Sequence, residues 1–116
     1  MDERIEKAFD VANYFVTLSN QRRIILEEFT QQTIFYINGA TFIIDPTLIN
    51  YTKIMLDLGH VQDVPFVDVN KLPVIINNVQ EFFDKINDIY FTALNKYAAK
   101  YGEISSKRNV KDIIGL

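Results

Sequence analysis

Residues 78–107, NVQEFFDKINDIYFTALNKYAAKYGEISSK, carry the apolar pattern that decides the fold. Their apolar side chains recur at spacings of three and four, which is the period of one buried face of an α-helix. Asn78 followed three residues later by Glu81 is typical of a helix start, because asparagine caps free backbone N–H groups. We therefore predict one long helix over residues 78–107, with weaker last turns because Gly102 lowers helix propensity there.

The N-terminal stretch predicts a second long helix, over residues 2–29, because its apolar residues also recur at helical spacing. These residues are Ile5, Ala8, Phe9, Ala12, Phe15, Val16, Ile25, Leu26 and Phe29. Residues 23–29 have a second interpretation as a strand, since two β-branched isoleucines stand there. We favour the helix, because Glu27 and Glu28 are good helix formers and poor strand formers.

Residues 33–45 carry the clearest local signal, which predicts a β-hairpin. The runs TIFYI (33–37) and ATFII (40–44) are rich in β-branched and aromatic residues. Asn38-Gly39 between them is the preferred two-residue hairpin turn, because both of its residues need a positive φ.

A short helix is expected directly after this hairpin. Asp45 suits the N-cap position, and Pro46 suits the first helical position, where its missing N–H is no loss. Gly59 predicts the end of the helix, since glycine readily adopts the left-handed conformation found there. Residues 60–65 then read as a polar loop.

A second hairpin is expected from residues 65–69 and 72–77, with a turn at Asn70-Lys71. Pro73 cannot donate a hydrogen bond to a neighbouring strand, so its strand lies at an edge or begins there.

The two hairpins are similar to each other in sequence. Asn38 lies 32 residues before Asn70, and FIID at 42–45 stands at the same offset from VIIN at 74–77. An internal repeat with one shared four-stranded sheet is one interpretation. The other is coincidence, because hairpins that lead into helices use the same turn and cap residues.

Together these elements predict an α+β fold within a single domain, residues 1–116. Two long terminal helices pack antiparallel, with two β-hairpins and a short helix between them, and residues 103–116 are a candidate flexible tail. The alternative takes 23–29 as a strand, giving an N-terminal helix and a small five-stranded barrel.

Composition excludes several classes of protein. The 116 residues include no cysteine, which rules out disulfides and thiolate chemistry, and the net charge is −3. A negative charge argues against a general nucleic-acid or anionic-membrane surface. No apolar run is as long as a membrane span. We expect a soluble protein of the cytoplasm or of a virion, without a membrane partner.

Catalytic patterns are weak in this sequence. His60, the lone histidine, stands with Asp57 and Asp63 in a polar stretch, which is more typical of a solvated loop than of a metal site. There is no Gly-x-Ser-x-Gly motif, and the four glycines are isolated from each other. We therefore expect no enzyme, no metal and no cofactor.

An aromatic row on the long C-terminal helix is the candidate interface: Phe83, Tyr90, Tyr97 and Tyr101. Packing within the chain or against another protein explains such a row more simply than base stacking. The leading functional hypothesis is a non-catalytic structural or interaction protein that self-associates through this face.

Two further groups of residues offer alternatives. Basic pairs that could contact phosphate predict a nucleic-acid-binding accessory protein; they are Arg22, Arg23, Lys107 and Arg108. Aliphatic residues in an otherwise polar C-terminal stretch predict a docking tail; they are Val110, Ile113, Ile114 and Leu116.

Three segments of the chain carry a resemblance to known proteins: LSNQRR (18–23), FYINGATF (35–42) and YFTALNKY (90–97). In these segments the chain resembles small uncharacterised proteins of T-even-type marine phages, such as cyanophages. The resemblance implies a phage origin and carries no known activity and no functional residues with it.

Overall fold

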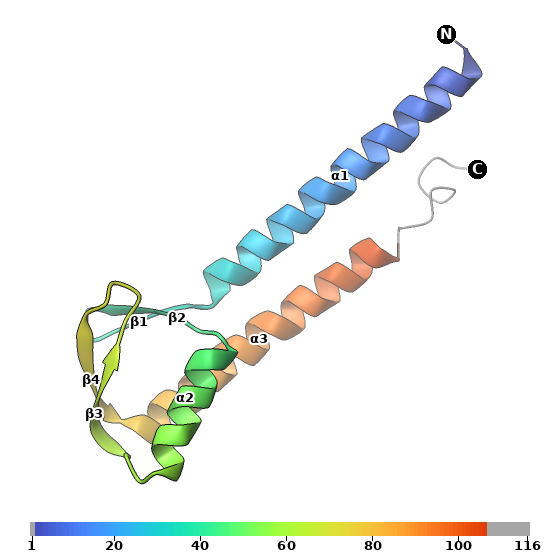
Figure 1. Ribbon diagram of the computed structural model, residues 1–116. Coiled ribbons are helices and arrows are strands. Elements are labelled where there is room, and N and C mark those ends of the chain that lie inside the picture. The colour runs from blue at the N-terminus through green and yellow to red at the C-terminus, as the bar shows by residue number, and fades with distance from the viewer. Residues whose placement is uncertain (1, 107–116) are drawn as a thin grey trace. The chain divides into compact units, whose positions relative to one another are not determined.

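Three helices and two β-hairpins make up residues 2–106, the part of the chain that our computed structural model describes (Figure 1). In chain order they are α1 (Glu3–Gln32), β1 (Ile34–Ile37), β2 (Ala40–Ile43), α2 (Pro46–Asp57), β3 (Gln62–Val67), β4 (Pro73–Asn78) and α3 (Val79–Ser105). The predicted α+β fold is confirmed. The alternative barrel is wrong, because residues 23–29 belong to α1 and the strands of the described part form only two-stranded sheets.

By its contacts the chain divides into two compact units. Among the described residues, unit 1 consists of 2–29 and 95–106, and unit 2 consists of 30–94. Each unit has its own apolar cluster.

The first hairpin of unit 2 forms as predicted. Asn38 and Gly39 have φ values of 51° and 77°, the positive values that a tight two-residue turn needs. After β2, the Asp45 carboxylate accepts a hydrogen bond of 2.8 Å from the backbone N–H of Leu48, which caps α2. Gly59 follows the end of α2 with a φ of 88°. These local predictions are confirmed because each rests on the conformational preference of a few neighbouring residues.

The second hairpin starts earlier than predicted. Residues 62–64 were expected in a loop, but β3 already begins at Gln62, with Asp63 at a φ of 54°. Pro65 lies opposite Ile75 in the ladder, and both strands of this sheet are edges. A proline is tolerated there because its missing N–H points away from the paired strand. The two hairpins form separate sheets, so the shared four-stranded sheet is not present.

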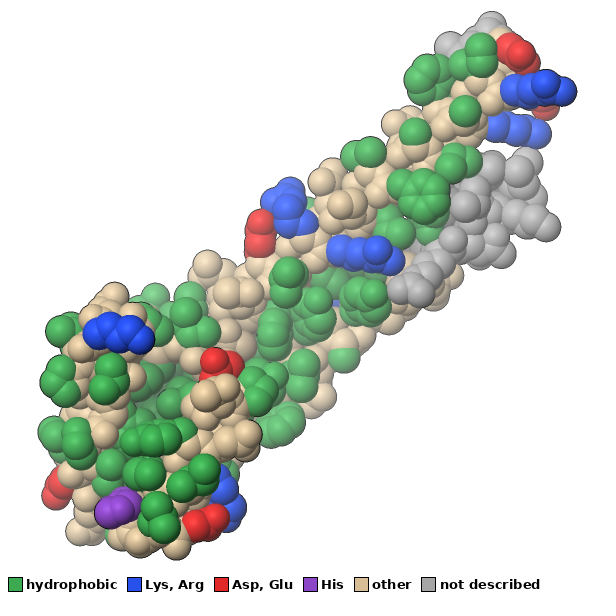
Figure 2. All heavy atoms as spheres, viewed as in Figure 1, with side chains coloured by type: hydrophobic (Ala, Val, Ile, Leu, Met, Phe, Trp, Pro, Cys, Tyr) green, Lys and Arg blue, Asp and Glu red, His purple; other side chains and the backbone are tan. Residues whose placement is uncertain are grey.

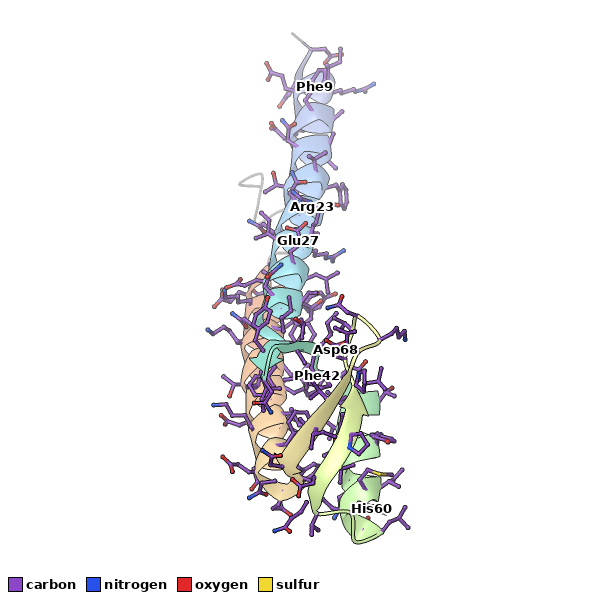
Figure 3. All side chains as sticks on the ribbon, turned by 90° about the vertical axis from the view of Figure 1, so that its left-hand side faces the viewer. Phe9, Arg23, Glu27, Phe42, His60 and Asp68 are labelled. Carbon is purple, nitrogen blue, oxygen red and sulfur yellow. The ribbon has the colours of Figure 1, made fainter. Side chains whose placement is uncertain are left out.

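The core of unit 2 joins both hairpins to the first turns of α3. The Phe66 ring on β3 lies edge-to-face with Phe82 on α3, at 5.2 Å, and with Tyr51 on α2, at 5.5 Å. Phe42 on β2, which is labelled in Figure 3, packs edge-to-face on Phe82 with ring centroids 5.5 Å apart. The buried residues are Ala40, Phe42, Ile44, Phe66, Ile76, Val79, Phe82 and Ile86.

Unit 1 is a pair of helices packed antiparallel. Ring centroids of Phe29 and Tyr97 are 4.9 Å apart, and Lys100 Nζ lies 2.7 Å from a carboxylate oxygen of Glu28. The buried cluster consists of Tyr14, Leu18 and Ile25 of α1 and Ile104 of α3. In these contacts the residue numbers of α1 decrease as those of α3 increase, as expected for antiparallel helices. The hydrogen bond from Lys100 also holds the pKa of the Glu28 carboxyl below its ordinary value.

The helix α3 continues through Gly102 to Ser105. A Cβ atom added at Gly102 would meet nothing within 4 Å, so this glycine is not needed for close packing. Asn78 caps the start of α3, accepting a hydrogen bond of 3.0 Å from the backbone N–H of Glu81. The predicted capping role of Asn78 is confirmed.

Candidate functional site

The first half of α1 exposes the apolar residues that the sequence predicts to pack inside. Ile5, Phe9 and Val16 are 47%, 57% and 61% exposed, and Ala12 is exposed as well. The expectation that these positions form the buried face of α1 is wrong, because every residue of 2–10 is exposed and α3 packs on Tyr14, Leu18 and Ile25 farther along the helix. Figure 2 shows apolar side chains gathered on the surface of α1.

The exposed and buried faces of α1 are opposite each other. Phe9 stands nine residues before buried Leu18, and Val16 stands nine residues before buried Ile25. Nine residues are about two and a half turns of an α-helix, so such positions point in opposite directions. The four exposed residues therefore form a row that faces away from α3; we name this row, Ile5, Phe9, Ala12 and Val16, the α1 stripe.

The spacing within the α1 stripe is that of a coiled coil. Successive members are separated by four, three and four residues, which is the alternation of d and a positions in a heptad repeat. The next two positions of the same series are Ser19 and Arg23, which are polar. The α1 stripe is thus a seam of about two heptads, long enough for a contact and short for a stable coiled coil.

The predicted aromatic interface is divided between the two units. Phe83 and Tyr90 lie in unit 2, where Tyr90 packs against the core. Tyr97 and Tyr101 lie in unit 1, where their rings stack at 6.4 Å and pack against the buried cluster. All four are partly buried. More fully exposed apolar side chains are found on α1, and others lie in unit 2.

The predicted basic residues of α1 are engaged within unit 1. The Arg22 guanidinium lies 5.9 Å from the centroid of the Tyr101 ring, at cation–π distance. Arg23 forms an ion pair of 3.0 Å with Glu27 one turn along the helix (Figure 3). The other predicted phosphate contacts and the docking tail lie outside the described residues; they are Lys107, Arg108, Val110, Ile113, Ile114 and Leu116. The nucleic-acid alternative stays a prediction.

Asp68 is a structural residue that the sequence analysis missed. It lies in the loop between β3 and β4 (Figure 3) and is only 4% exposed. Its carboxylate accepts hydrogen bonds from the backbone N–H groups of Thr41, at 3.2 Å, and of Asn70 and Leu72, both at 2.9 Å. The N–H of Val69 donates to the Thr41 carbonyl oxygen at 3.0 Å. Asp68 thus joins the two hairpins. An aspartate two residues before a turn is the local signal that could have identified it.

These hydrogen bonds predict an acid-sensitive fold. The bond from the Leu72 N–H above all holds the pKa of the Asp68 carboxyl below its ordinary value, although burial acts in the opposite direction. Because this pKa is lower in the folded than in the unfolded chain, the carboxylate stabilises the fold fully above about pH 4. That contribution is lost as the pH falls through the folded-state pKa.

We therefore expect Asp68→Asn to lower the urea midpoint at pH 7 and to flatten the decline of the midpoint below about pH 4. Urea titrations of the variant and the wild type across this pH range measure both effects. Asp57→Asn, at an exposed position outside the loop, is the matched control. A pH dependence of Asp68→Asn equal to that of the wild type would contradict the role of this carboxylate.

Neither a metal site nor a membrane-spanning helix is found among the described residues. Within 2–106, no group of three or more His, Cys, Asp or Glu side chains is arranged to hold a metal ion, and His60 is exposed. No helix in this part of the chain has the length and apolar character needed to cross a bilayer. Comparison with known proteins adds no relative, since no family model, no curated protein and no solved structure matches the chain.

Proposed function

We propose that the protein is a non-catalytic interaction protein that self-associates through the α1 stripe. The observation that carries this proposal is the exposed apolar seam on the face of α1 opposite to its packing face. The predicted aromatic row on α3 is partly buried within the chain, so the α1 stripe replaces it as the interface.

The first turns of α1 would gain stability from a bound partner. Every residue from Asp2 to Asp10 is exposed, so this segment has no buried face within unit 1. An isolated helix shorter than about 12–15 residues is only marginally stable in water. Burying a large apolar side chain such as Phe9 contributes about 1.5–3 kcal/mol. A partner on the α1 stripe would therefore stabilise these turns.

A second copy of the chain is the partner that the α1 stripe fits. An identical stripe presents the same d and a positions, so two helices related by a two-fold axis would interdigitate. A lipid surface fits less well, because residues 2–10 hold four acidic and two basic side chains, a net charge of −2, and amphipathic helices bind anionic membranes through basic residues.

We propose that, in a chain of phage origin as the resemblance implies, such self-association has a structural use. A protein of this kind would act in an assembly of the virion or of the infected cell, and its function would be the contact itself. This role needs no catalytic group, cofactor or metal.

Sedimentation equilibrium of the full chain tests the proposal. Because the seam is short, we expect a weak association in which the average mass rises above 13.5 kDa between about 10 μM and 1 mM. A constant mass of 13.5 kDa over this whole range would rule the proposal out.

A further inference from the structure

Unit 2 has a groove at its surface that opens onto two residues of its core, Ile76 and Phe82. The groove has a volume of about 640 Å³ and lies between the first hairpin, β4 and the first turns of α3. Its floor is apolar and is formed by Phe35, Ile37, Ile76 and Phe82. Phe35 and Ile37 are only partly buried, so apolar surface remains open to a ligand.

The α3 side of the groove is acidic. Glu81, Asp84 and Asp88 line it together with Lys85, which makes a net charge of −2. These positions are three or four residues apart, so their side chains share one face of the helix. Asp84 is held in place by a hydrogen bond of 2.9 Å from the Gln80 amide. The groove therefore combines an apolar floor with a negative wall and suits a ligand that is both aliphatic and cationic.

The chain itself contains a segment of that chemistry. Residues 107–116, KRNVKDIIGL, hold three cationic side chains against one acidic one, and four aliphatic side chains. They lie outside the described residues. An extended peptide in a groove binds through just such a combination of pockets and charge.

We propose that residues 107–116 of a second copy of the chain dock in this groove. The cationic side chains lie along the carboxylates of α3, and the aliphatic side chains lie on the floor. This contact joins different surfaces of the two copies, so it can repeat from copy to copy, whereas a two-fold contact through the α1 stripe closes on itself. The proposal does not depend on the α1 stripe.

Fluorescence anisotropy with a labelled synthetic peptide, SSKRNVKDIIGL (105–116), tests the docking. The receptor is the full chain carrying Phe9→Glu. This substitution removes association through the α1 stripe, so the binding that is measured does not depend on it. We expect saturable binding with a Kd on the order of 10–100 μM. Asp88→Lys in the groove should weaken binding at least about tenfold, since it places a cation against the cationic peptide.

Two controls make the test specific. Asp57→Lys makes the same change of charge at an exposed helix position outside the groove. We expect its Kd for the peptide to be within about twofold of the Kd of the Phe9→Glu receptor that lacks this change. A peptide with Ile113→Asp and Ile114→Asp should bind at least about tenfold more weakly. No saturable binding at about 1 mM, equal effects of Asp88→Lys and Asp57→Lys, or equal binding of a scrambled peptide would each overturn the proposal.

Discussion

Replacing Phe66 by alanine is expected to remove about 3–5 kcal/mol from the free energy of unfolding. The Phe66 side chain is 2% exposed and its ring contacts Phe82 and Tyr51 edge-to-face. Truncation leaves a cavity where β3, α2 and α3 meet, and the aromatic contacts are lost with it. A domain of this size has about 5–15 kcal/mol of stability in total, so the variant should lose a large part of its stability.

Urea denaturation followed by circular dichroism measures this effect, with Phe91→Ala as the matched control. Phe91 is also a phenylalanine of unit 2, but it is 51% exposed. Its truncation should change the unfolding free energy by less than about 1 kcal/mol. If Phe66→Ala and Phe91→Ala lowered the free energy of unfolding equally, the assignment of Phe66 to the core of unit 2 would be contradicted.

The second large effect is expected in unit 1, where Leu18→Asp should separate the two helices. Leu18 is 7% exposed and belongs to the cluster that joins α1 to α3. Loss of a buried leucine costs about 2–5 kcal/mol, and burying a carboxylate without a partner costs more. Amide hydrogen exchange should therefore show lost protection at residues 97–104 and retained protection in the strands of unit 2.

Val16→Asp is the matched control, because Val16 is 61% exposed on the opposite face of the same helix. At a concentration where the chain is monomeric, it should leave the protection of residues 97–104 unchanged. Loss of protection in both variants would show that the α1 stripe takes part in the packing of unit 1.

Local signals allowed most of the elements to be predicted. The turn at Asn38-Gly39 and the cap at Asp45 depend on neighbouring residues alone, and both form as expected. The choice of helix over strand for residues 23–29 was also correct, since Glu27 and Glu28 favour a helix. The start of β3 was missed because Asp63, a poor strand former, continues the strand with a positive φ.

The α1 stripe could not be predicted to be exposed. The spacing of apolar residues indicates a helix face that can be buried, but not which other element, if any, covers that face. The spacing of Ile5, Phe9 and Val16 is typical of a buried helix face, yet α3 packs on Tyr14, Leu18 and Ile25 instead. Only the length of α3 and its antiparallel register decide which residues of α1 it covers. Asp68 was missed for a similar reason, since one of its hydrogen-bond donors, Thr41, is 27 residues away.

Self-association through the α1 stripe is tested most directly by sedimentation equilibrium of two matched variants, Phe9→Glu and Phe91→Glu. Both replace a phenylalanine that is about half exposed on a helix, at 57% and 51%, with the same charged side chain. We predict that the average mass of Phe91→Glu rises with concentration as that of the wild type does, and that the mass of Phe9→Glu stays below it throughout the range from about 10 μM to 1 mM. An equal increase in mass for both variants would show that the chain does not associate through the α1 stripe.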